Sequence, residues 1–253
     1  MTDCTRGELL AVVAAQEVRN DDVVVVGLGL PQIGALLATR THAPDAVLLL
    51  EIGVFEPDPR SPSMGIADPR MWEGCASFGS MLDVLGCMLH GGRVTLGMLG
   101  ALQVDGDGSI NSTAVRHEDG SERRLNGSGG ANDIASMAGR TLAIIQHQPR
   151  KFRAAVDFVT SPGRRIRGRP RAELGLPGRG TTTIITDRAV LDVGEQGLVL
   201  RSFHPGESAE GIVADTPVPL SFPEGGPVET PAPSSDQIRL IRAELDPHGW
   251  YTR

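Results

Sequence analysis

Short apolar runs separated by helical or turn-rich stretches dominate the first half of the chain. A helical pattern comes first, because Thr5 and Glu8 have the spacing of a capping box and apolar residues follow on one face to about Asn20. An apolar run at 23–26 then leads through glycines into a second helical stretch at 33–39. Alternation of this kind predicts an α/β fold with a mainly parallel open sheet flanked by helices. The further runs that predict buried strands are 46–50, 93–98 and 142–146.

The pattern changes after residue 160. Residues 161–180 are rich in arginine, glycine and proline and predict a long loop, which is either a solvated connector or a segment that grips a subunit or a phosphate. Two apolar runs, 181–186 and 189–193, flank a short turn and predict a hairpin. A proline-rich traverse at 216–235 precedes a closing helix at 236–246. Because α/β chains of 253 residues commonly stay undivided, we expect one domain over residues 1–253.

The composition of the chain argues against several classes of function. A net charge of -7 argues against bulk attraction to nucleic acid or to an anionic membrane, so neither is expected as a partner. The three cysteines have no CxxC spacing and predict neither a disulfide framework nor a zinc site, which indicates a reducing cytoplasm. No apolar run approaches the ~18 residues that span a bilayer, and no signal-like segment opens the sequence. We therefore expect a cytoplasmic protein that is neither exported nor embedded in a membrane.

Glu51 is the best catalytic candidate in the chain. It stands where the aliphatic run 47–50 stops and the turn-rich stretch 52–59 begins. In open α/β sheets, ligands bind at the carboxyl ends of such strands. A carboxylate at this place is suited to act as a nucleophile or a base, and the alternative is that it caps the next element or pairs with an arginine.

Three glycine-rich segments follow predicted strands or precede predicted helices. Gly27, Gly29 and Gly34 depart from the GxGxxG spacing of a dinucleotide site, and Pro31 intervenes, so a nicotinamide or flavin cofactor is disfavoured. Residues 97–112 close a strand with small side chains, where exposed N–H groups could hold an oxyanion. Residues 127–133 form a turn before a helix predicted at 133–138, and its amides suit an anion. Each segment is also compatible with an ordinary turn.

Other common chemistries find no support in the sequence. The six histidines form no HxH or HxxxH pair, so no metal site is expected, and each histidine is interpreted as structural or exposed. The sequence contains no GxSxG, and no cysteine lies in a nucleophile motif. The glycine turn at 127 also lacks the GK[ST] ending of a nucleotide-triphosphate loop.

Taken together, a series of short motifs resembles the B (beta) subunit of two-subunit class I coenzyme A transferases, most closely that of the glutaconate CoA-transferases. The resemblance covers nearly the whole chain, and its specificity comes from the order and spacing of the motifs. They are 26–35, 43–45, 51–53, 103–105, 111–113, 127–132, 157–163, 174–178, 238–242 and 246–247.

The resemblance implies a role for each candidate residue. Glu51 matches the catalytic nucleophile of that family, which forms a covalent glutamyl-CoA thioester by ping-pong chemistry. The amides of Gly100 and Ala101 are expected to stabilise the oxyanion of each tetrahedral intermediate. The turn residues Gly127, Gly129, Gly130 and Ala131 are expected to contact coenzyme A or the partner chain. Coenzyme A enters as a substrate, and no permanently bound cofactor or metal is implied.

The resemblance also implies a partner. Family members act with an A (alpha) subunit of the same fold, so we expect an α2β2 heterotetramer with the active site between the two chains. Two alternatives stay open. One is a hydrolase subunit of the same superfamily that cleaves an acyl-CoA or opens a ring, and the other is a non-catalytic scaffold that completes a partner's site. Ile52 and the stretch 55–60 depart from the family's pattern, which leaves the acyl group undefined.

Overall fold

The computed structural model describes residues 4–66, 68–117 and 119–253. Its Cα atoms group into two compact units. Unit 1 comprises the chain up to Leu99 together with Ala232–Arg253, and unit 2 comprises Gly100–Pro231. Within the described residues, no helix is both long and apolar enough to cross a membrane. The prediction of one domain over residues 1–253 stays a prediction.

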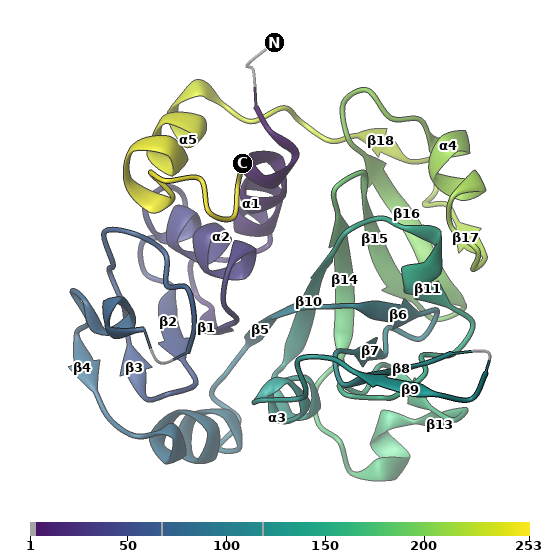
Figure 1. Cartoon of the computed structure of the whole chain (residues 1–253), viewed down its shortest axis with the longest axis horizontal. Helices are drawn as coiled ribbons and strands as arrows, with labels where there is room; N and C mark the ends of the chain where they lie inside the picture. Colours follow the sequence, from purple (N-terminus) through teal and green to yellow (C-terminus); the bar gives the residue numbers. More distant parts are fainter. Residues whose placement is uncertain (1–3, 67, 118) are drawn as a thin grey trace. The chain divides into compact units, whose positions relative to one another are not determined.

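Unit 1 has a parallel core with a hairpin at its edge (Figure 1). The central strand β1 (Val23–Val26) pairs in parallel with β2 (Val47–Leu50) and with β5 (Leu96–Gly100). Beyond β2, the short strands β3 (Val54–Phe55) and β4 (Ser77–Phe78) continue the sheet in antiparallel fashion. β1 and β2 are almost wholly buried, as expected for aliphatic strands of a parallel sheet. The strands predicted at 23–26 and 46–50 are therefore confirmed.

Helices cover this sheet and pack against one another. α1 (Arg6–Gln16) packs against α2 (Leu30–Thr39), and the π-helical turn η5 (Ile241–Leu245) also contacts α2. Both bonds of the predicted capping box form, from the Glu8 amide to Thr5 Oγ1 and from the Thr5 amide to the Glu8 carboxylate. Gly34 serves this packing, because a Cβ there would lie 2.8 Å from the Ala14 Cβ. The remaining helical elements of the unit are η1 (Pro69–Trp72), the π-helix η2 (Leu82–Leu89) and α5 (Ser235–Leu240).

Unit 2 contains a mixed sheet. β10 (Arg140–Ile145) pairs in parallel with β14 (Thr181–Thr186), and antiparallel pairing continues through β15 (Ala189–Gly194) to β16 (Gly197–Phe203). The hairpin predicted from 181–186 and 189–193 is thus confirmed. Two short strands, β17 (Leu220–Ser221) and β18 (Val228–Glu229), pair in parallel with β16. An α/β fold with a mainly parallel sheet flanked by helices is confirmed, with antiparallel strands added toward the sheet edges.

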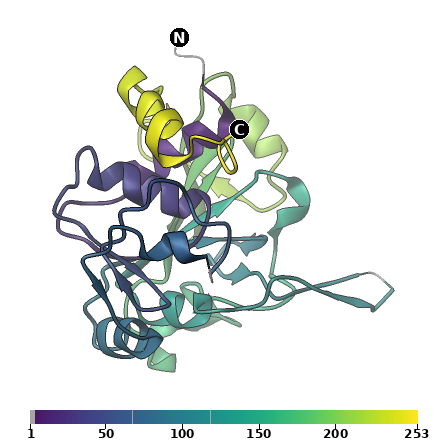
Figure 2. The same ribbon diagram turned by 60° about the vertical axis from the view of Figure 1, so that its left-hand side comes forward.

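Smaller elements complete unit 2. A three-stranded sheet joins β11, β6 and β7, and the β8–β9 hairpin projects from the rest of its unit as an exposed arm (Figure 2). Their bounds are β6 (Gln103–Asp105), β7 (Ile110–Asn111), β8 (Ala114–Arg116), β9 (Glu122–Arg124), α3 (Ala131–Met137), η3 (Pro149–Lys151), β11 (Phe152–Arg153) and α4 (Ala209–Ala214).

The two irregular segments foreseen from the sequence contain short elements. Residues 161–180 include the β12 (Arg165–Ile166) and β13 (Arg169–Pro170) hairpin and the 3-10 turn η4 (Arg171–Leu174). The proline-rich traverse is irregular apart from β17 and β18. The closing helix is confirmed as α5 followed directly by η5, which together span Ser235–Leu245.

Candidate functional site

Glu51 is placed by the end of β2. Leu49 and Leu50 are buried, and the half-buried Glu51 is the first residue of the tight turn that leads to Val54. Because β1, β2 and β5 run in parallel, their carboxyl ends lie along one edge of the unit 1 sheet. Glu51 therefore lies at the edge where open α/β sheets bind ligands.

Gly27 is the neighbour of Glu51 along this edge. Val25 pairs with Leu49 and Val26 pairs with Met98. Continuing the register by two residues along β2 and by one residue along β5 brings Gly27 beside Glu51 on one side and Leu99 on the other. Neighbouring strands lie about 4.8 Å apart. The Gly27 amide donates to the Met98 carbonyl at 2.9 Å, and a Cβ on Gly27 would lie 2.7 Å from that oxygen. Glycine is therefore required here, because a side chain would not fit against the Met98 carbonyl at the strand ends.

A second glycine fixes the turn that carries Glu51. The Gly53 amide donates to the Leu50 carbonyl at 3.0 Å, and its φ of 104° is one that residues with a Cβ rarely adopt. Gly79 donates to the Gly53 carbonyl at 2.7 Å, and a Cβ on Gly53 would lie 2.6 Å from the Gly79 carbonyl. The Glu51 turn is thus held from both sides, which limits the positions that the carboxylate can take.

The C-terminal residues approach this edge, which no sequence pattern indicates. Gly29, with a φ of 79°, is the N-cap of α2, and the Tyr251 ring lies 3.2 Å from the place a Gly29 Cβ would take. The Tyr251 hydroxyl donates to the Ser63 carbonyl at 2.9 Å. Buried Asp246 holds this tail by accepting bonds from three consecutive amides, those of Trp250, Tyr251 and Thr252. The Tyr251 ring therefore covers the start of α2, two residues from Gly27.

In the first turn of α2, the side-chain amide of Gln32 has an unused donor. Its Oε1 accepts bonds from the Ser63 amide at 3.3 Å and the Ser63 hydroxyl at 3.0 Å. This pairing fixes the amide orientation, because only the oxygen can accept from a backbone N–H. Within the described part of the chain, the buried Gln32 Nε2 has no hydrogen-bond acceptor.

Gly100 and Ala101, the residues foreseen for the oxyanion, belong to unit 2. Gly100 ends β5 and is exposed, whereas Ala101 is buried. The Ala101 amide donates to the Ile144 carbonyl at 2.9 Å, and the next amide, that of Leu102, donates to the Asn111 carbonyl. The Ala101 N–H is therefore used inside the fold, which argues against its role as an oxyanion donor. The role of Gly100 stays a prediction.

The glycine turn at 127–131 lies in the same unit and is hydrogen-bonded to Ser112, the residue that follows β7. The Gly127 amide donates to the Ser112 carbonyl at 2.9 Å, and the Ser112 hydroxyl donates back to the Gly127 carbonyl at 2.8 Å. α3 begins at Ala131, two residues before the predicted start, and the Ala131 amide donates to Ser128. That amide is therefore not available to an anion, while Gly127 and Gly129 have the positive φ that the turn requires.

Several polar motif residues of unit 2 hold its loops together. Asn111 Nδ2 donates to Gln103 Oε1 at 2.7 Å, and Gln103 Nε2 donates to the Asp157 carboxylate at 2.8 Å. Burial acts to raise the pKa of Asp157, but these hydrogen bonds and Arg153 hold that pKa below its ordinary value. Burial raises the pKa of Asp105, whose carboxylate accepts from the Ser109 amide. We assign these residues to the framework of unit 2.

The structure thus separates the foreseen site residues into two groups. Glu51 stands with Gly27 and Gly53 at the strand ends of unit 1, a group to which Gly29 and Tyr251 are now added. Gly100, Ala101 and the 127–131 turn lie in unit 2, where the strand end and the turn are connected through Asn111 and Ser112.

Known proteins match the chain along most of its length. The family model described as Coenzyme A transferase matches residues 8–215. The B subunit of glutaconate CoA-transferase from Acidaminococcus fermentans is 34% identical over 253 residues, which cover 97% of this chain and 94% of the relative. The B subunit of 3-oxoadipate CoA-transferase from Pseudomonas knackmussii is 35% identical over 245 residues, with 96% and 94% coverage.

Two further matches bear on the fold and on the alternatives. The crystal structure of glutaconate coenzyme A-transferase from A. fermentans superimposes with a TM-score of 0.88 at 33% identity and covers 99% of both chains. The IpdB subunit of a cholesterol ring-cleaving hydrolase from Mycobacterium tuberculosis is 27% identical over 251 residues, with 96% and 95% coverage. Since a family model spans more than half of the chain and two relatives exceed 30% identity, the chain belongs to the coenzyme A transferase family.

Proposed function

We propose that this chain is the beta subunit of a two-subunit enzyme that moves coenzyme A from an acyl-CoA to a carboxylic acid, with Glu51 as the nucleophile. One observation carries the proposal. Glu51 is a half-buried carboxylate at the carboxyl ends of parallel strands, in a turn that Gly53 and its hydrogen bonds hold in place. Membership of the coenzyme A transferase family supplies the reaction class.

The reaction follows from carboxylate chemistry. A Glu51 oxygen attacks the thioester carbonyl, and the carbon–sulfur bond breaks to give an acyl-glutamyl anhydride and coenzyme A thiolate. The thiolate then attacks the glutamyl carbonyl and releases the first carboxylate, which leaves a glutamyl-CoA thioester. An acceptor carboxylate reverses these two steps and departs as the new acyl-CoA. Every step exchanges one acyl bond for another, so no proton is gained or lost.

Carboxylates are weak nucleophiles, so the site must stabilise each oxyanion and use binding energy from distant parts of coenzyme A. We assign the amide of Gly100, an exposed residue at the end of β5, to the first task. Because the Ala101 amide donates to Ile144, it can share that task only if this bond is given up. Gly127, Gly129 and Gly130 are proposed to contact coenzyme A or the partner chain, as the absence of side chains permits close approach.

A partner chain completes the proposal. Relatives of this chain are named as B subunits, and we propose an A subunit of the same fold in an α2β2 heterotetramer. Exposed apolar side chains, which normally mark interaction surfaces when they gather, support a partner on unit 1. We call them the 64–82 apolar segment; they are Met64, Ile66, Trp72, Phe78, Met81 and Leu82.

Replacement of Glu51 tests the reaction. In the complex reconstituted with its A subunit, Glu51→Gln should lower transfer by at least ~10³-fold, because the nucleophile is lost while size and polarity are kept. Glu56→Gln is the matched control, since Glu56 is exposed on the same hairpin. Wild-type protein incubated with acyl-CoA should also carry a borohydride- or hydroxylamine-sensitive group at Glu51 by mass spectrometry. Full activity of Glu51→Gln would support the scaffold alternative and contradict the proposal.

The second candidate is a hydrolase of the same family, favoured by the relative named as a ring-cleaving hydrolase subunit. The two reactions differ in the final acceptor. With labelled coenzyme A, a transferase should give a new acyl-CoA only when a carboxylic acid is added. A hydrolase should instead consume acyl-CoA at the same rate with or without that acid, and this result would overturn the transferase proposal.

A further inference from the structure

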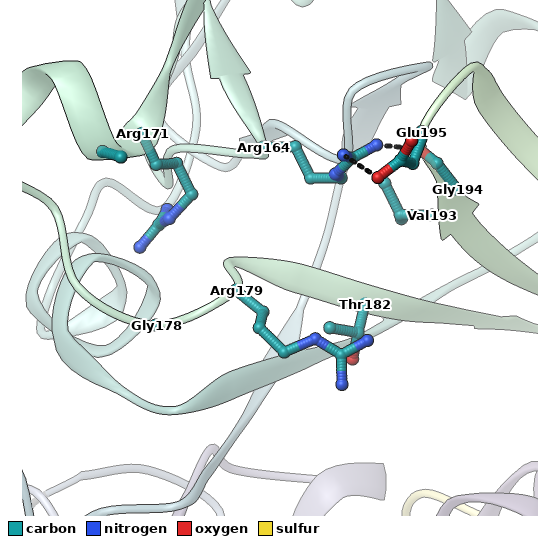
Figure 3. A pocket seen from close by; sticks show the side chains of 9 residues that line it. Arg164, Arg171, Gly178, Arg179, Thr182, Val193, Gly194 and Glu195 are labelled. Carbon is teal, nitrogen blue, oxygen red and sulfur yellow. Dashed lines mark hydrogen bonds and ion pairs between the residues drawn. The ribbon is translucent and has the colours of Figure 1, made fainter.

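A basic pocket of about 500 Å³ lies within unit 2, well separated in sequence from Glu51 (Figure 3). Arg164, Arg171 and Arg179 line it together with Thr182 and the β15–β16 turn residues Gly194 and Glu195. In Figure 3, the arginines come from different segments, with Arg164 and Arg171 on one side of the space and Arg179 with Thr182 on the other. We call it the Arg164–Arg179 pocket.

Arg171 gives this pocket a buried positive charge. The side chain is only 5% exposed, and its guanidinium is held by backbone carbonyls instead of a carboxylate. Burial lowers the pKa of Arg171, and no acid among the described residues offsets this effect. Within the same part of the chain its Nε has no acceptor. The carbonyls that accept from its Nη atoms are those of Pro162, Gly163, Ala135, Ser136 and Pro177.

The other lining charges leave the pocket positive. Arg164 donates to the Gly194 carbonyl and lies 4.0 Å from the Glu195 carboxylate. The Glu195 side chain is 94% exposed, so solvent screens it and it neutralises little of the pocket. Arg179 is exposed, and its backbone amide donates to the Gly139 carbonyl. The three arginines and the one solvated acid together carry a net positive charge that is close in size to the negative charge of a dianion.

Phosphate groups match this arrangement. Guanidinium groups bind phosphate oxygens through paired hydrogen bonds, and a charge without a carboxylate partner in a low-dielectric wall strengthens that attraction. Thr182 lines the same pocket, and its hydroxyl donates to the Thr141 carbonyl at 3.4 Å. We propose that the Arg164–Arg179 pocket is a binding site for a phosphate-bearing anion, held by Arg164 and Arg179 in the field of buried Arg171. The site does not depend on the proposed transfer reaction, because its ligand can bind without turnover.

Binding of inorganic phosphate to the full-length chain tests the site. Calorimetry and thermal unfolding with phosphate, against potassium chloride at equal ionic strength, should show saturable binding and a raised melting temperature. Arg179→Gln should weaken phosphate binding by about tenfold, as loss of one charged hydrogen-bonding group predicts. Arg165→Gln is the matched control, because Arg165 is exposed on the same segment and does not line the pocket. Arg164→Gln should repeat the effect.

Coenzyme A and dephospho-coenzyme A are two further probes that distinguish the possible sources of the phosphate group. If coenzyme A binds more tightly than dephospho-coenzyme A, and Arg179→Gln removes the difference, the pocket holds the 3′-phosphate of coenzyme A. If inorganic phosphate binds in an Arg179-dependent way and coenzyme A does not, the ligand is a free phosphate. The proposal is overturned if phosphate protects no better than chloride, or if Arg165→Gln and Arg179→Gln bind every probe as the wild type does.

Discussion

His147 is a buried residue whose protonation state is set by its surroundings. Its Nδ1 and Nε2 lie 3.1 Å from Thr186 Oγ1 and 3.0 Å from Thr216 Oγ1, and its ring packs against Phe152. Burial, with a smaller contribution from Arg188, lowers the pKa of His147 to about 4. The sequence leads us to interpret the histidines as structural or exposed, and His147 is structural.

This shift predicts how stability depends on pH. Between the ordinary pKa of 6.5 and about 4, the unfolded chain binds the proton and the folded chain does not. The contribution of neutral His147 to the free energy of unfolding is therefore complete above pH 6.5. It is lost as the pH falls toward 4, and the total loss is roughly 3 kcal/mol. In urea unfolding experiments, the free energy of unfolding of His147→Gln should fall less over this pH interval than that of the wild type. Identical pH slopes for the two proteins would contradict the assignment.

At the scale of elements, one buried carboxylate connects the first and last helical segments. Glu8 is fully buried in α1 and accepts bonds from Arg242 Nε at 2.6 Å and Nη2 at 2.9 Å, in addition to its capping bond. Burial acts to raise the pKa of Glu8, but Arg242 and the Thr5 amide hold it below its ordinary value. The capping box is visible in the sequence, whereas the pairing with Arg242, 234 residues away, is not.

Removal of Arg242 should destabilise the protein by leaving Glu8 without its charged partner. A fully buried pair would cost roughly 3–5 kcal/mol to break. Because the Arg242 side chain is 41% exposed, we expect about 2–3 kcal/mol for Arg242→Ala. Arg239→Ala is the control, since its exposed pair with Asp236 should contribute less than about 1 kcal/mol. Equal free energies of unfolding for the two variants would show that the Glu8 contact is unimportant.

Element boundaries show where sequence patterns stop being informative. α2 begins at Leu30 rather than at residue 33, because Gly29 takes a positive φ that starts the helix and Pro31 is accepted in its first turn. β5 begins at Leu96 rather than at 93, since the Arg93 amide still bonds to Met88 at the end of the π-helix. The strands and helices that the sequence predicts are present because apolar periodicity is local, while their ends depend on turns and neighbours.

At the scale of the whole molecule, the 64–82 apolar segment predicts where a partner chain binds unit 1. Leu82 is 71% exposed, and its burial against an A subunit should stabilise the complex by about 1.5–3 kcal/mol. Leu82→Ser should therefore raise the dissociation constant at least about tenfold in sedimentation experiments with the A subunit. Phe222→Ser is the control, because Phe222 is 51% exposed but lies in unit 2. A larger effect of Phe222→Ser on the dissociation constant would indicate instead that the A subunit binds unit 2.

The sequence by itself determined the α/β class, the strand that ends at Leu50 and the place of Glu51 after it, because these depend on the local order of apolar and polar residues. The order of its motifs also indicated the coenzyme A transferase family. Only the tertiary structure decided that the Ala101 amide is used by Ile144, that the Tyr251 ring covers Gly29, and that Arg171 is buried among backbone carbonyls. Contacts between residues distant in the chain fix all three, and no local pattern encodes such contacts.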